Sequence, residues 1–148
     1  MHKLNILVIG GMGFIGSTLS GALLAEGHAI SVLSRSPASG WFLGENVPII
    51  RADVSKTGLW QDQISDYDVI VNLTGASIFR RWTGPGKREI VNSRILTAGN
   101  IVEAIRKKRG NIQSFISVSG VGFYGFHGES LRRRGKQEDD RVNQKTFF

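Results

Sequence analysis

The sequence predicts an α/β protein in which a parallel sheet of about five strands is covered by helices on both sides. Short apolar runs rich in β-branched residues alternate with longer segments whose apolar residues recur at helical spacing. The first run ends in a glycine cluster that opens the first helical segment. A succession of strand, helix and strand requires crossover connections, which are typical of parallel sheets. The 148 residues, 41% hydrophobic and 21% charged, have the length and composition of one globular domain.

The first half of the chain is expected to hold three strands and one helix. Leu4–Ile9 is predicted as a buried strand because its residues are apolar, partly β-branched and followed by glycines. In Phe14–Glu26 apolar pairs recur every three or four residues, which predicts a helix, and a glycine follows as a stop signal. Ala29–Leu33 and Val47–Ile50 are two further apolar strands, separated by a loop at Ser34–Asn46 that is rich in Ser, Pro and Gly.

The second half of the chain continues the alternation of strands and helices up to the fifth strand, and its last residues do not follow this pattern. A short, weak helix is expected around Gly58–Ile64, and a buried strand at Asp68–Leu73. Lys87–Arg109 is the longest helix, with apolar pairs along one side and cations in its last turn that complement the helix dipole. Ser114–Val118 is the fifth strand. Phe126–Phe148 has few apolar residues and ten charged ones, so we expect residues 1–125 to form the domain and residues 126–148 a polar, poorly ordered tail.

Composition excludes several classes of function. The chain has no cysteine, which excludes disulfides and thiolate metal sites, and its three histidines, His2, His28 and His127, are dispersed, so no metal site is predicted. No apolar run has the length of a membrane span, and we expect a cytoplasmic protein. The net charge of +7 favours anionic partners such as phosphate-bearing small molecules. No nucleic-acid partner is expected, because the basic run Arg132–Arg134 is followed at once by the acidic Glu138–Asp140.

A glycine-rich motif lies between the first predicted strand and the first helix. It satisfies G-x-G-x-x-G, and with one further glycine also G-x-x-G-x-x-G; its residues are Gly10, Gly11, Met12, Gly13, Phe14, Ile15 and Gly16. Glycines allow a tight turn and a close approach of the main chain to a pyrophosphate, whose charge then meets the helix N-terminus. The alternative is an ordinary glycine-rich turn between a strand and a helix.

The end of the second strand indicates which dinucleotide would bind. An NAD site usually has an acidic residue there, whereas this chain has Ser34 and Arg35. A guanidinium pairs with a 2′-phosphate, so NADP is favoured over NAD; the alternative is a solvated arginine. Asp53, after the third strand, is placed either to accept a hydrogen bond from the adenine amino group or to cap a helix.

Five motifs in order resemble the extended or atypical short-chain dehydrogenase/reductases, an NAD(P)-dependent epimerase/dehydratase family, and in particular their nucleoside-diphosphate-sugar epimerase branch. The motifs are residues 10–16 (GGMGFIG), 34–37 (SRSP), 72–76 (NLTGA), 80–83 (RRWT) and 117–125 (SVSGVGFYG). The resemblance covers about residues 3–125 and implies a Rossmann-type fold with NADP across the carboxyl ends of the strands.

The resemblance also implies roles for single residues. It assigns Gly10, Gly13 and Gly16 to the phosphate loop, Arg35 to the 2′-phosphate and Asp53 to adenine. Leu73, Thr74 and Gly75 match the wall beside the ribose and nicotinamide. Ser119 matches the hydroxyl that hydrogen-bonds the reacting sugar oxygen in active relatives, and Ser117 is a second candidate. Arg80 and Arg81, beside a tryptophan, are candidates to hold the diphosphate of a nucleotide-sugar-like substrate, or else belong to a solvated loop.

Two departures from the family pattern bear on activity. The family commonly uses Tyr-x-x-x-Lys, but Val71 and Gly128 stand four residues after the two tyrosines, Tyr67 and Tyr124. Relatives are about twice as long and carry a C-terminal substrate region, so we expect a truncated, inactive chain whose uncovered sheet edge favours homo-oligomers. The sequence therefore leaves two hypotheses: the NADP-binding domain of an epimerase or reductase-like oxidoreductase, or a dinucleotide-binding or interaction module without turnover.

Overall fold

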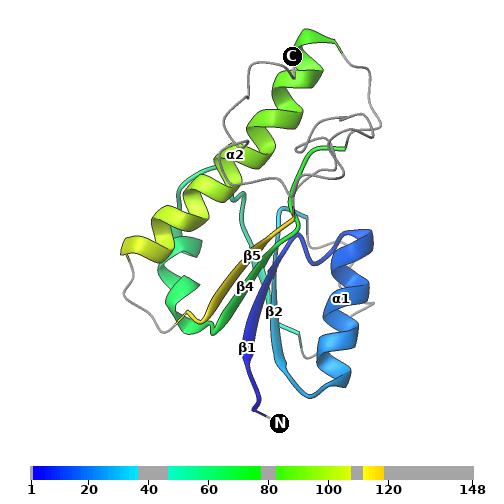
Figure 1. Ribbon diagram of the computed structural model, residues 1–148, viewed down its shortest axis with the longest axis vertical. Helices are drawn as coiled ribbons and strands as arrows, with labels where there is room; N and C mark the ends of the chain where they lie inside the picture. Colours follow the sequence, from blue (N-terminus) through cyan, green and yellow to red (C-terminus); the bar gives the residue numbers. More distant parts are fainter. Residues whose placement is uncertain (1, 37–46, 78–82, 108–111, 119–148) are drawn as a thin grey trace, which may run out of the picture. The chain divides into compact units, whose positions relative to one another are not determined.

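Five parallel strands form one sheet in the order β3-β2-β1-β4-β5, which confirms the predicted fold class (Figure 1). The computed structural model describes residues 2–36, 47–77, 83–107 and 112–118, all within a single unit that spans residues 1–118. The strands are β1 (Asn5–Ile9), β2 (Ala29–Ser34), β3 (Ile49–Arg51), β4 (Val69–Asn72) and β5 (Ser114–Ser117). The helical elements are α1 (Phe14–Ala25), the 3-10 helix η2 (Leu59–Asp66) and α2 (Gly84–Lys107).

The strand order reverses beside β1. The chain runs outward from β1 through β2 to β3, and then returns to place β4 on the opposite side of β1. Figure 1 shows α1 on one face of the sheet and α2 on the other. The segments that follow β1 and β4 therefore leave the sheet toward opposite faces. In open α/β sheets, ligands bind outside the carboxyl ends of the strands at such a reversal of the strand order.

Alternate residues of the strands supply two separate cores, because successive side chains of a strand point to opposite faces. The α1-side core combines one set of strand residues with leucines of α1; its buried members are Ile6, Val8, Ile30, Val32 and Val71. The α2-side core combines the other set with η2 and α2; its buried members are Leu7, Ile9, Leu33, Val54, Trp60, Ile64, Ile70, Ile101 and Ala104. Both faces of the central strands are thus covered, as the continuous apolar runs predicted.

Element boundaries agree with the prediction to within a few residues, and the largest difference is at the start of α2. We predicted this helix to begin at Lys87, but it begins at Gly84. The Thr83 hydroxyl accepts a hydrogen bond from the Gly86 amide (3.3 Å), which caps the first turn. Pro85 is tolerated in that turn because its missing N–H has no helical partner to lose.

Some predictions lie outside the described residues. These are most of the loop at Ser34–Asn46 and the tail at Phe126–Phe148, so the domain boundary at residue 125 stays a prediction. Among the described residues, no helix combines the length and apolar character that crossing a membrane requires.

Candidate functional site

The glycine loop joins β1 to α1 and packs tightly against its neighbours. Gly10 has a φ of +82°, a left-handed conformation that suits glycine, and its amide donates to the Leu33 carbonyl of β2 (2.9 Å). The Gly13 amide then donates to the Gly10 carbonyl (3.0 Å), which closes the turn. A side chain at Gly16 would collide with the main chain of Gly10 and Gly11. The loop therefore requires glycine at position 10 for its backbone conformation and at position 16 for lack of space.

The N-terminus of α1 is open. Its N-cap residue is Gly13, no side chain among the described residues caps it, and its first turn has no acidic residue. The Met12 side chain packs against the α1-side core, whereas Phe14 and Ile15 are 92% and 61% exposed. The unpaired amides of the first turn and the positive end of the helix dipole thus dominate the chemistry at this point. Such a cradle suits a phosphate group.

Charged residues gather where β2 and β3 end. A shallow hollow of about 370 Å³ is lined by Arg35, Arg51, Ala52 and Asp53. Arg51 is the register partner of Ser34, so both guanidiniums come from adjacent strand ends. The Ser34 hydroxyl donates to the Ser36 carbonyl (3.2 Å), which turns the chain directly after β2. The structure thus brings together Arg35 and Asp53, and it adds Arg51, which sequence reasoning missed.

Local hydrogen bonds hold the Asp53 carboxylate. Its Oδ1 accepts from the Ser55 hydroxyl (2.7 Å) and from the Ser55 amide (3.0 Å). The bond from the Ser55 hydroxyl is the main cause that lowers the pKa of Asp53 below its usual 3.8, and the positive charge of Arg35 contributes further. Asp53 does not cap the next helix, because the N-cap residue of η2 is Gly58, so that alternative reading of Asp53 is wrong.

The segment after β4 forms the other side of the site. Asn72, which is buried, accepts at Oδ1 from the Thr74 hydroxyl (2.6 Å) and the Thr74 amide (3.1 Å). Its Nδ2 donates to the Ser117 hydroxyl at the end of β5 (3.3 Å). A Cβ on Gly10 would lie 3.3 Å from main-chain and side-chain atoms of Leu73 and Thr74. The glycine loop, the segment after β4 and Ser117 therefore share one edge of the sheet.

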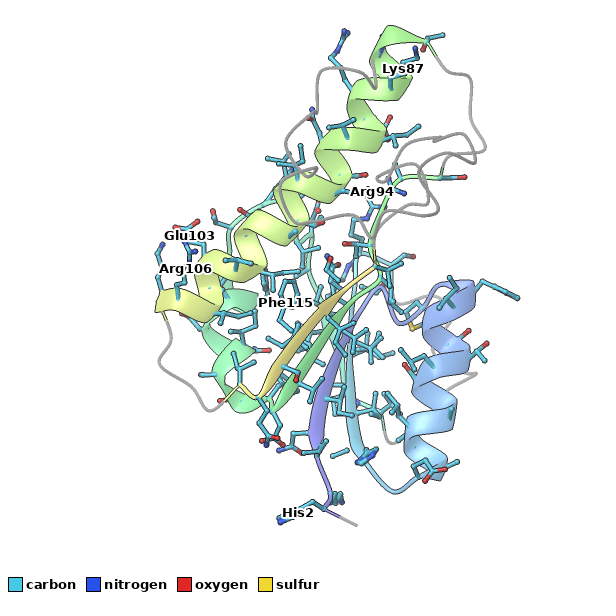
Figure 2. All side chains as sticks on the ribbon, viewed as in Figure 1. His2, Lys87, Arg94, Glu103, Arg106 and Phe115 are labelled. Carbon is cyan, nitrogen blue, oxygen red and sulfur yellow. The ribbon has the colours of Figure 1, made fainter. Side chains whose placement is uncertain are left out.

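Two residues of α2 that sequence reasoning missed also contact this segment. The Ser93 hydroxyl accepts a hydrogen bond from the Ala76 amide (2.9 Å), and Arg94 Nη1 donates one to the Ala76 carbonyl (3.4 Å). Figure 2 shows the Arg94 side chain extending from α2 toward the segment after β4. The sequence placed both residues in a helix, and no local motif marked them. Ser119, Arg80 and Arg81 lie outside the described residues.

The fold and this edge of the sheet define a Rossmann-like, dinucleotide-binding class of protein. The family model for the NAD dependent epimerase/dehydratase family matches residues 6–146. The chain belongs to this family, which confirms the resemblance derived from its motifs.

Individual relatives agree with this assignment. The epimerase family protein YfhF of Bacillus subtilis is 34% identical over 122 residues, which are 82% of this chain and 39% of that protein. The structure of human epimerase family protein SDR39U1 (isoform 2) with NADPH matches at a TM-score of 0.61 with 31% identity, covering 81% of this chain and 38% of that one. The structure of a variant of Bacillus cereus UDP-glucuronic acid 4-epimerase, in complex with UDP-4-deoxy-4-fluoro-glucuronic acid and NAD, matches at a TM-score of 0.70 with 26% identity. The match covers 84% of this chain and 42% of that one.

The coverage of these relatives limits what transfers to this chain. The chain spans about two fifths of the length of the relatives it matches. The matched part is the dinucleotide-binding region of the family. Within the part of the chain that the structure describes, no three acidic or histidine side chains come together as metal ligands.

Proposed function

We propose that this chain binds NADP at the carboxyl edge of its sheet. In this proposal the main-chain amides of residues 10–16 hold the pyrophosphate and Arg35 pairs with the 2′-phosphate. Asp53 accepts a hydrogen bond from the adenine amino group, which its ionised state permits. The open first turn of α1 and the close packing at Gly16 support the first assignment, because a phosphate fits where no side chain stands.

The residues that line the hollow beside β2 support the choice of NADP over NAD in this proposal. Two guanidiniums, from Arg35 and Arg51, flank it, and its one carboxylate, on Asp53, is already hydrogen-bonded to Ser55. A ribose 2′-hydroxyl needs an acceptor, whereas a 2′-phosphate needs cations. The charge balance of the hollow therefore favours the phosphorylated dinucleotide, in line with the relative whose structure contains NADPH.

We further propose that the whole protein of which this region is part acts as an epimerase or reductase-like oxidoreductase on a nucleotide sugar. Bound NADP supplies a hydride acceptor or donor. Leu73, Thr74 and Gly75 form the wall that orients its nicotinamide end. The hydroxyl of Ser119, with Ser117 as the second candidate, hydrogen-bonds the reacting oxygen. Arg80 and Arg81 hold the substrate diphosphate.

A second candidate function is a dinucleotide-binding or interaction module without turnover. One specific observation favours it: no lysine stands four residues after either tyrosine, so the chain lacks the tyrosine–lysine pair that the family commonly uses for proton exchange. We therefore expect no measurable oxidation or reduction of the cofactor by this chain with any nucleotide sugar. Turnover with one of them would favour the first candidate.

Calorimetric titration with NADPH and NADH tests the cofactor assignment. We expect NADPH to bind more tightly than NADH. Arg35→Ala should lower the affinity for NADPH about 10- to 100-fold, since a charge-assisted hydrogen bond contributes about 1.5–3 kcal/mol. NADH affinity should hardly change. Arg106→Ala, which removes the same charge from the far end of α2, is the matched control and should leave both affinities unchanged. Equal affinities for the two cofactors before and after Arg35→Ala would refute the assignment.

A further inference from the structure

Both polar groups of the Ala76 main chain are held by one turn of α2. The Ala76 amide donates to the Ser93 hydroxyl (2.9 Å), and the Ala76 carbonyl accepts from Arg94 Nη1 (3.4 Å). The Ser93 hydroxyl and Arg94 Nη1 also donate to one and the same carbonyl, that of Ile90, at 2.9 and 3.0 Å. The two side chains are therefore fixed on their own helix before they reach the neighbouring segment.

The Arg94 guanidinium also lies against the main chain of Gly75. A Cβ at residue 75 would stand 3.1 Å from Cζ, 3.2 Å from Nη2 and 3.4 Å from Nη1 of Arg94. The first two distances are shorter than most side-chain contacts, so the guanidinium would have to shift by a few tenths of an ångström to admit a larger residue at position 75. Arg94 is itself half-buried. The guanidinium thus lies beside Gly75 as well as donating to the Ala76 carbonyl.

The opposite end of the same segment is fixed independently. Asn72 holds Thr74 through two hydrogen bonds, and Thr74 lies so near Gly10 of the glycine loop that a Cβ on Gly10 would stand 3.3 Å from its Cγ2. The three residues Thr74, Gly75 and Ala76 are therefore anchored at one end by β4 and at the other by α2. A short segment with both ends held has little freedom left, which is the condition for binding a ligand without an ordering cost.

We propose that Ser93 and Arg94 are positioning residues that hold residues 74–76 in the shape that receives the nicotinamide half of the dinucleotide. The proposal rests on the proposed function, in which this segment is the wall beside the nicotinamide. Neither residue reaches the hollow at Arg35 and Asp53, which belongs to strands on the other side of β1. Loss of the α2 contacts is therefore expected to affect one half of the ligand and to spare the other.

Binding of two probes separates the halves. NADPH spans the whole site, whereas adenosine 2′,5′-bisphosphate carries only the adenosine end with its phosphates. We expect Ser93→Ala and Arg94→Ala each to lower the affinity for NADPH about tenfold. This is the loss expected if residues 74–76 adopt the binding conformation only about a tenth of the time. Affinity for adenosine 2′,5′-bisphosphate should stay within about twofold of the wild type. The fluorescence of bound NADPH, which reports on the nicotinamide, should also change in both variants.

Further variants keep the test decisive if Arg94→Ala does not fold. Gly75→Ala would make the Arg94 guanidinium shift by a few tenths of an ångström, so it should give the same pattern with a smaller loss of NADPH affinity. In the Arg94→Ala background it should have no additional effect. Arg94→Lys keeps the charge but loses the planar fork, so it should restore NADPH binding only in part. Arg106→Ala, in the last turn of the same helix (Figure 2), is the charge-matched control.

Each result has a definite meaning. Selective loss of NADPH binding, with the adenosine probe retained, supports the proposal. Equal weakening of both probes would show that Ser93 and Arg94 act only through the stability of the fold, and it would overturn the proposal while leaving the proposed function intact. Unchanged NADPH binding in the folded variants would also overturn it. A wild-type chain that binds neither probe would overturn the proposed function and this inference together.

Discussion

Identical Gly→Ala substitutions at two positions of α1 are expected to change stability in opposite directions. At Gly16 the added Cβ would stand 2.5 Å from the Gly11 Cα and 2.8 Å from the Gly11 carbonyl carbon, in addition to meeting the Gly10 carbonyl oxygen. At Gly21, about 1.4 helix turns further along the same helix, no atom outside the neighbouring backbone of α1 lies within 4 Å of the added Cβ. The two sites therefore differ in steric surroundings and share the same secondary structure.

The expected magnitudes follow from these contacts. Alanine is favoured over glycine inside a helix by about 1 kcal/mol, so Gly21→Ala should stabilise the protein by about that amount. At Gly16 the same gain is offset by overlap with main-chain atoms that cannot rotate away, which costs about 3 kcal/mol at the upper end of the range for overpacking. The net effect is a loss of about 2 kcal/mol. At about 4 °C per kcal/mol, the melting temperatures of the two variants should differ by about 12 °C.

Thermal unfolding followed by circular dichroism measures this difference, and a urea titration at 25 °C gives the matching free energies. NADPH binding by the Gly16→Ala variant should also weaken, because the main chain that forms the cradle must shift. A Gly16→Ala variant as stable as the wild type would show that the glycine loop is not packed as described. Destabilisation by Gly21→Ala would show instead that helix propensity does not govern the exposed side of α1.

Two further predictions concern the Asp53 carboxylate and the α2-side core. Because the pKa of Asp53 is lowered from 3.8, chiefly by the Ser55 hydroxyl, its ionised form stabilises the fold at pH values above 3.8 and this contribution is lost as the pH falls through the lowered pKa. The stability advantage of the wild type over Ser55→Ala, measured by urea unfolding from pH 7 to pH 3, should therefore shrink at the acid end; an advantage that grows toward low pH would contradict this. Ile101→Ala removes a side chain with no exposed surface and should cost about 2–5 kcal/mol in the same measurement. Ile95→Ala on the same helix, where the side chain is 64% exposed, should change stability by less than about 0.5 kcal/mol, and similar losses at both positions would refute the burial pattern.

The predictable part of the fold was the part that depends on local sequence. Apolar periodicity located the strands and both long helices, and the glycine cluster located the loop between β1 and α1. The start of α2 was predicted three residues late, because Gly84, Pro85 and Gly86 suggest a loop when the cap at Thr83 is not recognised. The length of a strand at the sheet edge, such as β3, depends on the partner with which it pairs, and a single strand pattern does not contain that information.

The two halves of the candidate site are held together in different ways, and this explains which of their contacts the sequence could not indicate. At the proposed adenosine end, Asp53 is fixed by Ser55 and Ser34 by Ser36, so the determining contacts lie two residues apart in the chain. Arg35 and Asp53 were predicted because they follow strands directly and match the family motifs, whereas Arg51, inside β3, was missed.

At the proposed nicotinamide end, the contacts join residues that are far apart in the chain. The bond between Asn72 and Ser117 spans 45 residues, and that between Ala76 and Ser93 spans 17. Asn72, Ala76 and Ser117 lie in motifs that the sequence shows, whereas Ser93 lies in none. Only the packing of α2 and β5 against β4 brings these groups together, so the sequence does not indicate which of them are in contact. The same difference has a physical consequence: local contacts persist as long as their own turn is intact, whereas the wall after β4 depends on the docking of α2. A change that loosens α2, such as Ile101→Ala, should therefore weaken binding at the nicotinamide end before it affects the adenosine end.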